Sequence, residues 1–354
     1  MNSKIKVLLA FDHELPLGGV SRSYKEAIID PTYELLSLSD NIGVKVNLFT
    51  DILCGDFFRR NGENAFYELY RSQLRETLTR GHDVQLHIHP HWIDSTFENK
   101  IYKPSSSFKL ADFKNRPYPN NIDGIIEKSI ALLNEICLPA KHDYQCISYR
   151  AGGFNLSPET ESILSSLMKH GIKIDSSIAK GLFIKSIYST VDYKKMPEQC
   201  NWYISPDKNL NIPVKDGIWE IPIATVSAGL WTNIIHVLRK YKYKERFFTT
   251  GKTIHNGKTK IGDKLRFVFS VRMLGFDVHT LTPCDLMKIL DSNVKKYSSE
   301  KEIILSTVSH PKNMGVYARG LMEGFVEKAR KKYGNDIEFP TFATIYKEKL
   351  MTTA

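Results

Sequence analysis

The most informative part of this sequence reads Val84-Gln85-Leu86-His87-Ile88-His89-Pro90-His91-Trp92, with three alternating histidines. On a β-strand the side chains of His87 and His89 would share a face, because strand side chains alternate. If the chain turned helical after Leu86, His87 and His91 would share a face instead. Either pair could chelate a zinc-like metal, for which neutral imidazole is a common ligand. The alternative is a structural cluster, in which each buried imidazole needs its own hydrogen-bond partner.

The composition is that of an ordinary globular protein. The chain has 354 residues, of which 42% are hydrophobic and 25% charged, enough for one large α/β domain with insertions or for two smaller domains. We expect a single domain over residues 1–354, with insertions at about 94–121 and 226–280. The apolar run at residues 4–11 ends at Asp12, too early for a signal peptide or a membrane span. Five scattered cysteines without CxxC spacing indicate reduced thiols, and we expect a cytoplasmic protein.

The positive charge is concentrated in one segment. The formal net charge is +10, and residues 239–272 hold eleven Lys or Arg residues against Glu245 and Asp263. This segment is either a solvated charged loop or a surface for an anionic partner, such as a membrane, a lipid-linked pyrophosphate or a sugar nucleotide. The second reading predicts peripheral contact with the inner membrane surface. Nucleic acid is not an expected partner, because no binding motif accompanies the charge.

Short apolar segments alternate with helical patterns along the chain. The expected strands are residues 5–11, 44–49, 84–87, 145–149, 172–174, 217–223 and 303–308. The expected helices are residues 33–38, 66–78, 125–136, 157–171, a segment starting near 282, and 321–332, with a long loop over residues 94–121. This alternation predicts a parallel sheet with right-handed crossovers, either open or closed into a barrel.

Polar side chains lie at or just past the carboxyl ends of five expected strands. They are Asp12, His87, Arg150, Asp175 and His310. Parallel α/β barrels assemble their active sites at this end, whereas structural polar residues could occur at either end. The pattern therefore indicates an enzyme.

These motifs resemble one known family. The stretches are Phe11-Asp12-His13-Glu14, Gly81-His82 through His91, Tyr149-Arg150-Ala151-Gly152-Gly153-Phe154, Asp175-Ser176-Ser177 and Ser309-His310-Pro311. Over residues 4–315 the chain resembles the polysaccharide deacetylases of carbohydrate esterase family four, especially the branch found with bacterial surface-polysaccharide biosynthesis, including lipopolysaccharide and O-antigen. The resemblance implies a distorted (β/α)7 barrel, here with the basic insertion between strands six and seven. It also implies metal-dependent removal of an N-acyl group, expected to be acetyl, from an amino sugar or a nucleotide- or lipid-linked glycan.

The family pattern implies a metal site, and this chain departs from that pattern. The family binds its metal through one aspartate and two histidines four residues apart, which would be His87 and His91. The family's first motif has two adjacent aspartates, the second of them a ligand, whereas this chain has Asp12-His13. Asp12, Glu14 or His13 could take the ligand's place, and His89 could replace His91. Zinc is the first expectation, with iron, cobalt or manganese as alternatives.

The resemblance also implies catalytic roles. Asp12 or Glu14, whichever does not bind the metal, would act as the base, and His310 would protonate the departing amine.

Two further residues would support this chemistry. Arg150 would hold the carboxylate by a bidentate pair, and Asp175 would orient His310, although both could instead form a structural ion pair. Trp92, Gly152 and Gly153 are expected at the substrate, with core packing as the alternative for the tryptophan. The two glycines stand where the family often has a proline and an aromatic residue.

Two other functions fit part of the pattern. Two histidines and a carboxylate also describe a non-haem iron oxygenase, although such ligands normally sit on an antiparallel barrel. A metal-free or inactive barrel could instead bind glycan as a scaffold.

Overall fold

The computed structural model describes residues 3–353 except 18, 21–22, 230, 232–233, 236–237, 239–270 and 278–280. Most of the basic insertion, and with it the predicted charged segment, lies outside the described residues. The two flanks of that insertion are paired, because β12 (Thr225–Ser227) and β13 (Val271–Met273) form an antiparallel ladder. In the part of the chain that is described, no helix has the length and hydrophobicity needed to cross a membrane.

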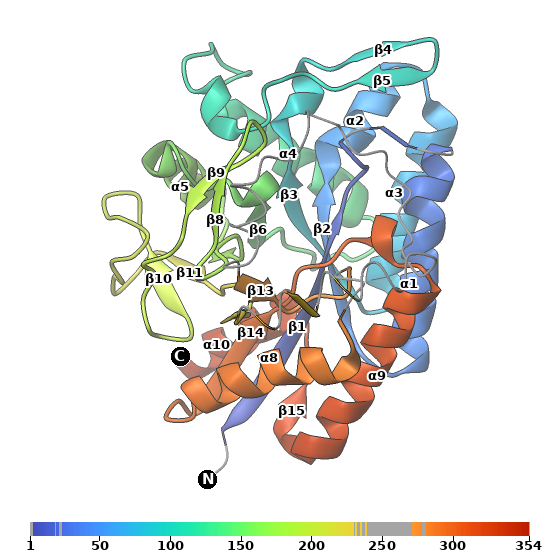
Figure 1. The fold of residues 1–354 in the computed structure, drawn as a ribbon. Coiled ribbons are helices and arrows are strands. Elements are labelled where there is room, and N and C mark those ends of the chain that lie inside the picture. The colour runs from blue at the N-terminus through green and yellow to red at the C-terminus, as the bar shows by residue number, and fades with distance from the viewer. Residues whose placement is uncertain are drawn as a thin grey trace.

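Seven parallel strands form the centre of the molecule (Figure 1). In spatial order they are β11 (Ile218–Glu220), β7 (Ile174–Asp175), β6 (Ser148–Ala151), β3 (Asp83–Ile88), β2 (Val46–Asp51), β1 (Lys4–His13) and β14 (Glu302–Ser306). The two ends of this row meet through a parallel bridge between Ile223, just after β11, and Ser306 of β14. The predicted distorted (β/α)7 barrel is therefore confirmed, and each of the seven expected strands coincides with one of these.

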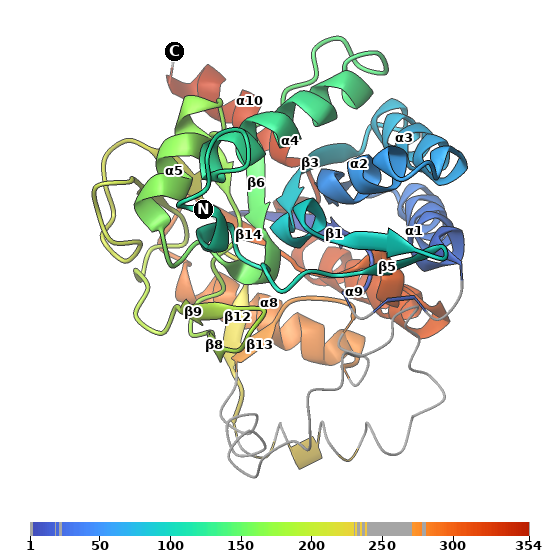
Figure 2. The ribbon, with the colours of Figure 1, turned by 90° about the horizontal axis from the view of Figure 1, so that it is seen from above.

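Helices surround the strands, as the view from above shows (Figure 2). They are α1 (Asp30–Asn41), which continues from a π-helical turn (Lys25–Ile29), α2 (Ile52–Arg60), α3 (Asn64–Thr79), α4 (Ile122–Cys137), α5 (Thr160–Lys169), α8 (Pro283–Lys296), α9 (Val316–Tyr333) and α10 (Phe342–Thr353). The start of α8 was predicted correctly, because Thr282 and Asp285 form a reciprocal capping box. The predicted start of α5 at Ser157 was wrong, since this helix begins at Thr160.

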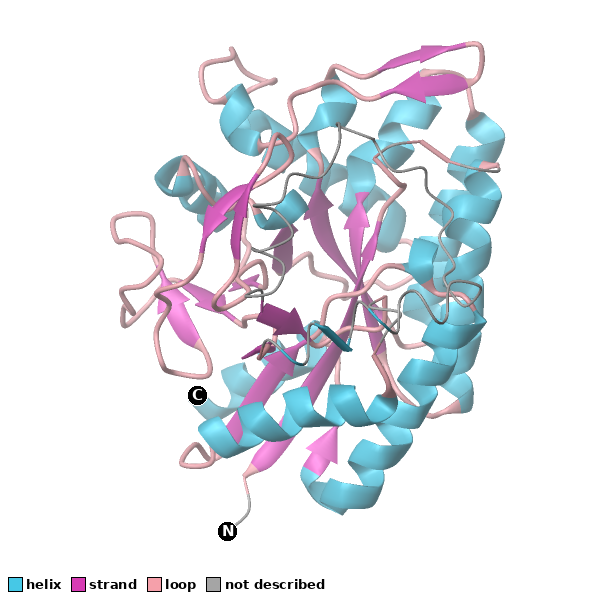
Figure 3. Ribbon diagram, viewed as in Figure 1, coloured by secondary structure: helices cyan, strands magenta, loops and turns pink. Residues whose placement is uncertain are grey.

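Other segments differ from the (β/α) pattern (Figure 3). Between β7 and β11 the chain forms a hairpin, β8 (Phe183–Lys185) with β9 (Thr190–Asp192), and then β10 (Trp202–Ile204), which runs antiparallel to β11. The predicted loop at residues 94–121 contains a hairpin, β4 (Thr96–Glu98) with β5 (Ile101–Lys103), and a 3-10 turn at Leu110–Phe113. A short strand, β15 (Ile337–Glu338), pairs with β1 outside the main row.

The interior of the barrel is apolar at its amino-terminal end. Leu8 and Ala10 of β1, Phe49 of β2 and Ile304 of β14 belong to one buried cluster with Phe342 of α10. Helix α10 therefore closes this end of the barrel. The strand ends that carry the predicted reactive side chains lie at the opposite, carboxyl end.

His82, part of the histidine-rich motif, lies far from that carboxyl end. It precedes β3, and its Nδ1 accepts a hydrogen bond of 3.2 Å from the backbone N–H of Val46. This nitrogen must be unprotonated to accept the bond. Burial accordingly lowers the pKa of His82 to about 4, although Asp40 partly opposes this shift. His82 is thus a structural residue.

We predict that His82 makes the fold sensitive to acid. Its folded pKa is below the unfolded value of about 6.5, so its contribution is complete above pH 6.5 and is lost as the pH falls towards 4. The loss is about 3 kcal/mol at most. His82→Asn, which places an oxygen near the Nδ1 position but does not titrate, should flatten this part of the stability profile. Denaturant unfolding at several pH values tests this, with the exposed His142→Asn as the control. Equal acid sensitivity in all three proteins would contradict the prediction.

Candidate active site

Strand β1 delivers two carboxylates to the carboxyl end of the barrel. Asp12 and Glu14 are two residues apart and share a face, while His13 between them points the other way. The Nε2 of His13 lies 3.1 Å from the Oε1 of Gln73 on α3, outside the barrel. His13 is therefore not a metal ligand in this structure.

Glu14 lies between two histidines and a lysine. Its Oε2 is 3.1 Å from the Nε2 of His87 and also contacts the Nε2 of His89, while its Oε1 accepts a hydrogen bond from Lys312. Burial alone would raise the pKa of Glu14, but Lys312, His89 and His87 together hold it well below its usual range. Glu14 is thus an anion inside the barrel.

Glu14, His87 and His89 form a cluster that could hold a metal ion, with their donor atoms all within 4.8 Å of one another. The Nδ1 of His87 lies 2.8 Å from the backbone oxygen of Arg150, which can only accept, so this nitrogen carries the proton. In neutral His87 the lone pair of Nε2 therefore points at a carboxylate oxygen. Two lone pairs that face one another repel unless a cation or an added proton lies between them. One carboxylate oxygen and two imidazole nitrogens are ligands that suit a divalent metal.

Gly152 makes room for His89. A Cβ at this position would lie 2.5 Å from the backbone oxygen of Ile88 and 2.8 Å from the Nδ1 of His89. Any larger residue would therefore displace the imidazole. Gly153, with a positive φ of 61°, takes a backbone conformation that favours glycine, and its oxygen accepts a hydrogen bond from Ser189. Both glycines had been expected at the substrate, and the contacts they make are within the protein.

His91 and Trp92 lie in the core beyond the cluster. The ring of His91 packs against those of Trp92 and Phe108, with centroids 4.7 and 5.6 Å away. Burial first, and then the nearby His89, push the pKa of His91 well below its usual range. Neither of its nitrogens has a hydrogen-bond partner among the described residues. Of the two histidines left open as the second ligand, His89 is the one that the structure brings to Glu14.

Trp92 is buried and cannot offer its face to a sugar, since only 1% of its surface is exposed. Its indole N–H donates to the Oδ2 of Asp51 at 2.6 Å, and the other oxygen of Asp51 accepts from the N–H of His89 at 3.3 Å. Burial raises the pKa of Asp51 to about 6, against the opposing effect of His89 and His87. Sequence reasoning missed Asp51, although it ends β2 as Asp12 and His87 end their strands.

Arg150 holds Asp12. Its Nη1 donates to the Oδ1 of Asp12 at 2.8 Å, in the position expected for the residue that holds a carboxylate, although through one oxygen and not two. The remaining guanidinium bonds go to oxygens of Ser176, Ser306 and Thr307. The Asp12 side chain is thus fixed, and it is not part of the Glu14 cluster.

His310 completes the site from the other side of the mouth. Its Nε2 lies 3.8 Å from the Oδ2 of Asp12 and 3.5 Å from the Oε1 of Glu14, and its Nδ1 pairs closely with Asp277. Burial would lower the pKa of His310, but Asp277 outweighs this and raises it. Asp277 therefore has the orienting position that had been expected for Asp175, which hydrogen-bonds to Ser177 instead. Asp277 lies near the end of the insertion at about 226–280, where no strand pattern marks it.

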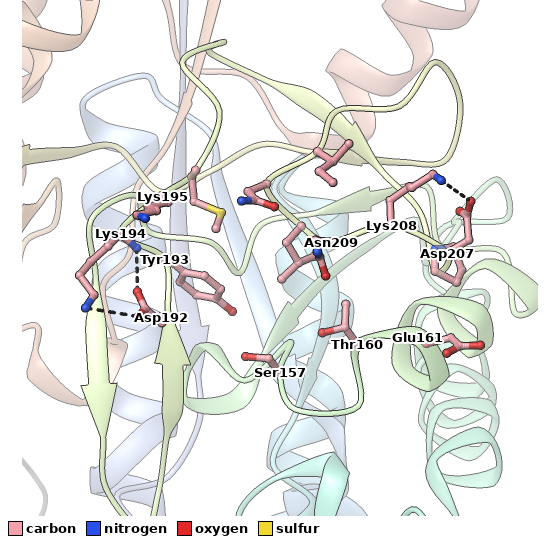
Figure 4. A pocket seen from close by; sticks show the side chains of 15 residues that line it. Ser157, Thr160, Glu161, Asp192, Tyr193, Lys194, Lys195, Asp207, Lys208 and Asn209 are labelled. Carbon is pink, nitrogen blue, oxygen red and sulfur yellow. Dashed lines mark hydrogen bonds and ion pairs between the residues drawn. The ribbon is translucent and has the colours of Figure 1, made fainter.

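A cavity of about 920 Å³ lies elsewhere, beside α5 and β9 (Figure 4). It is lined by polar side chains such as Thr160, Lys195 and Asn209, together with ion-paired Asp192 and Lys194. None of the clustered residues above lines it. Cavity size therefore does not locate the reactive groups of this protein.

Comparisons with known proteins show likeness in fold. No protein-family model matches the sequence. No curated protein matches it either. A GH57-type branching enzyme from Pyrococcus horikoshii is similar in structure with a TM-score of 0.51 at 12% identity, covering 98% of this chain and 70% of that one. The 4-alpha-glucanotransferase from Thermococcus litoralis has a TM-score of 0.50 at 13% identity, covering 97% and 40%.

A protein assigned as a polysaccharide deacetylase in Mycobacterium smegmatis has a TM-score of 0.49 at 12% identity, covering 100% of this chain and 92% of that one. That score is too low to support a conclusion. The branching enzyme and the glucanotransferase are only 12% and 13% identical to this chain, so their likeness concerns the fold alone. The chemistry must therefore be argued from the site.

We predict that His87→Ala and His89→Ala each abolish stoichiometric metal binding, because each removes a donor atom of the Glu14 cluster. His91→Phe should retain the metal, because it keeps a ring in the core and removes only two nitrogens that are not part of the Glu14 cluster. Elemental analysis of purified proteins measures this, with circular dichroism as the check on folding. About one bound metal per chain in folded His87→Ala would rule out this site.

Proposed function

We propose that this protein is a metal-dependent amide hydrolase. Its substrate would be an N-acylated, expected to be N-acetylated, amino sugar or linked glycan of surface-polysaccharide biosynthesis. One observation carries the proposal: the Glu14–His87–His89 cluster lies beside two pairs suited to proton transfer, Asp12 with Arg150 and His310 with Asp277. The deacetylase-like motifs of the sequence support the same chemistry.

Glu14, His87 and His89 would hold the metal, with zinc as the first expectation. A divalent metal bound there would polarise the amide carbonyl and make water a nucleophile at neutral pH. Lys312 occupies the Oε1 of Glu14, so this carboxylate would offer the Oε2 alone. The protein would thus present one carboxylate oxygen and two imidazole nitrogens from the carboxyl ends of β1 and β3.

Asp12 would take the proton of the attacking water. Arg150 binds its Oδ1 and thereby directs the Oδ2 towards His310 and the mouth of the barrel. A base must be oriented towards the water, and the buried guanidinium fixes this orientation.

His310 would give a proton to the departing amine. Asp277 on its Nδ1 orients the ring and favours its protonated form, which leaves Nε2–H as the donor. His310 is a quarter exposed, more than Asp12 or Glu14, so its side chain can be reached from the mouth.

An oxygenase would use the same donor set. Two histidines and one carboxylate are shared with non-haem iron oxygenases. Hydrolysis is favoured because it needs a base and an acid. The proposed acid, His310, lies 3.5 Å from Glu14 of the cluster, and the proposed base, Asp12, lies 3.8 Å from His310. Acyl release under strict anaerobiosis separates the two, since hydrolysis needs no oxygen. A scaffold without activity would release no acyl group under any condition.

We predict that Asp12→Asn and His310→Ala retain the metal and lower turnover by about two to four orders of magnitude, the usual worth of a positioned acid or base. The loss in His310→Ala should shrink for substrates with better leaving groups, which need less protonation. Acetate released from N-acetylated amino sugars measures turnover, and His170→Ala, a histidine paired with Asp123 away from the barrel mouth, is the control. Undiminished release from metal-free protein would contradict the proposal.

The same proposal includes contact with an anionic membrane, where lipid-linked glycans are assembled. It rests on the sequence of residues 239–272, of which 239–270 lie outside the described residues. Each Lys or Arg near an anionic bilayer contributes roughly 1 kcal/mol, an effect that salt screens.

We predict that changing Lys240, Lys242, Lys244 and Arg246 to Ser weakens cosedimentation with anionic vesicles, and that high salt weakens the wild type likewise. A matched control replaces four exposed lysines elsewhere by Ser: Lys173, Lys195, Lys208 and Lys215. If the two variants bind equally, this segment is not the membrane contact.

A further inference from the structure

Two carboxyl groups that the proposed reaction does not use lie side by side on the outer face of the barrel wall. Asp175 on β7 and Glu220 on β11 stand opposite each other in the ladder, and both are fully buried. Paired residues of neighbouring strands point to the same face of a sheet, so the two carboxyl groups face one another. If both were ionised they would repel one another, and a hydrogen bond between them needs a proton, because an ionised carboxylate has no hydrogen to donate.

The neighbouring donors show where the proton is. The N–H and O–H of Ser177 donate to the two oxygens of Asp175 at 2.9 and 2.8 Å, so Asp175 acts as an acceptor. The N–H of Ile178 donates to the Oε1 of Glu220 at 3.3 Å. The Oε2 of Glu220 has no donor among the described residues. A proton on this Oε2, shared with Asp175 on the neighbouring strand, would give this oxygen its missing partner.

We propose that Asp175 and Glu220 share a single proton and act as a positioning pair for the proposed active site. Burial first, and then the nearby Asp175, keep the pKa of Glu220 well above its usual range. Burial also raises the pKa of Asp175, and the nearby Arg150 partly opposes this rise. Lys180 partly opposes the rise in the pKa of Glu220. The pair therefore holds one negative charge.

Ser177 links this pair to the site. While it donates to Asp175, its Oγ accepts a hydrogen bond of 2.8 Å from the backbone N–H of Ala151. Ala151 stands between Arg150 and Gly152. The side chain of Arg150 holds Asp12, and its backbone oxygen accepts a hydrogen bond from Nδ1–H of His87. His89 packs against Gly152. Displacing this peptide would move the proposed base and both histidine ligands together.

Infrared spectroscopy tests the shared proton. Wild-type protein at neutral pH should show the C=O stretch of a protonated carboxyl, apart from the carboxylate bands. Glu220→Gln should lose this band, because its amide N–H can donate to Asp175 without a shared proton. An unchanged band in Glu220→Gln would overturn the proposal.

The positioning role has a separate test. Asp175→Asn leaves one oxygen for the two donors of Ser177, so we expect the imidazole N–H signal of His87 in NMR spectra to shift and exchange faster. We also expect zinc affinity to fall about 10- to 100-fold, as is usual for residues that support metal ligands. Glu220→Gln should preserve both the signal and the affinity.

Asp83→Asn is the matched control. Asp83 is also a buried carboxyl that accepts backbone N–H bonds, from Val84 and Ala343, but it lies at the other end of the barrel. This variant should lose stability while keeping the His87 signal and the zinc affinity. If Asp175→Asn behaves like Asp83→Asn, the pair is merely structural and the positioning role is excluded.

The positioning role rests on the proposed function, and the two can fail separately. Wild-type protein that binds no zinc would overturn the metal-dependent hydrolase. The infrared band and the His87 signal would still decide whether the pair shares a proton and holds the 150–152 segment.

Discussion

The structure depends on one buried guanidinium. Arg150 has no exposed surface, and its N–H groups donate to oxygens on β1, on the segment after β7, and on β14 with the residue that follows it. A charge in this position is tolerated only because it is paired and because its hydrogen bonds are satisfied. Its guanidinium also lies over the ring of Phe49, 4.3 Å from the centroid, and Phe49 in turn packs against Phe342 of α10. Arg150 therefore separates the apolar end of the barrel from the polar mouth, and it ties together strands that are distant in the sequence.

Burial raises the pKa of each of four carboxyl groups in and around the site, and the partners of each group decide the direction of the net shift. Glu14 and Asp277 each face a cationic group, Lys312 and His310 respectively, and their pKa values are lowered despite burial. Asp51 and Glu220 have weaker support, and burial raises their pKa values. Carboxyl groups whose pKa values are shifted in opposite directions can take separate roles. Glu14, with the lowered pKa, lies with the histidines, and Glu220, with the raised pKa, belongs to the pair that we propose supports the site.

The fold could be predicted from the sequence more fully than the site. Apolar runs mark buried parallel strands directly, so all seven barrel strands and their order along the chain were expected. The choice between His89 and His91 depends on where β3 ends, and periodicity does not resolve a boundary of one or two residues. Trp92 could not be placed, because nothing local distinguishes a buried indole from an exposed one. Asp277 was missed for a different reason: it approaches His310 only through the tertiary fold, at the end of a long insertion.

The departures from the family's motifs agree with one another once the strand period is considered. At the end of β1 the carboxylates are Asp12 and Glu14, two apart, and at the end of β3 the histidines are His87 and His89, also two apart, with Glu14 and His89 directly after their strands. Side chains two apart on a strand point to the same side, so each strand can present both of its groups to the barrel mouth without a break in its hydrogen bonding. β3 ends at Ile88, and Pro90 begins a 3-10 turn that carries His91 into the core beside Trp92. The proposed ligand set, built from residues two apart at two strand ends, would account for both the missing second aspartate and the additional histidine.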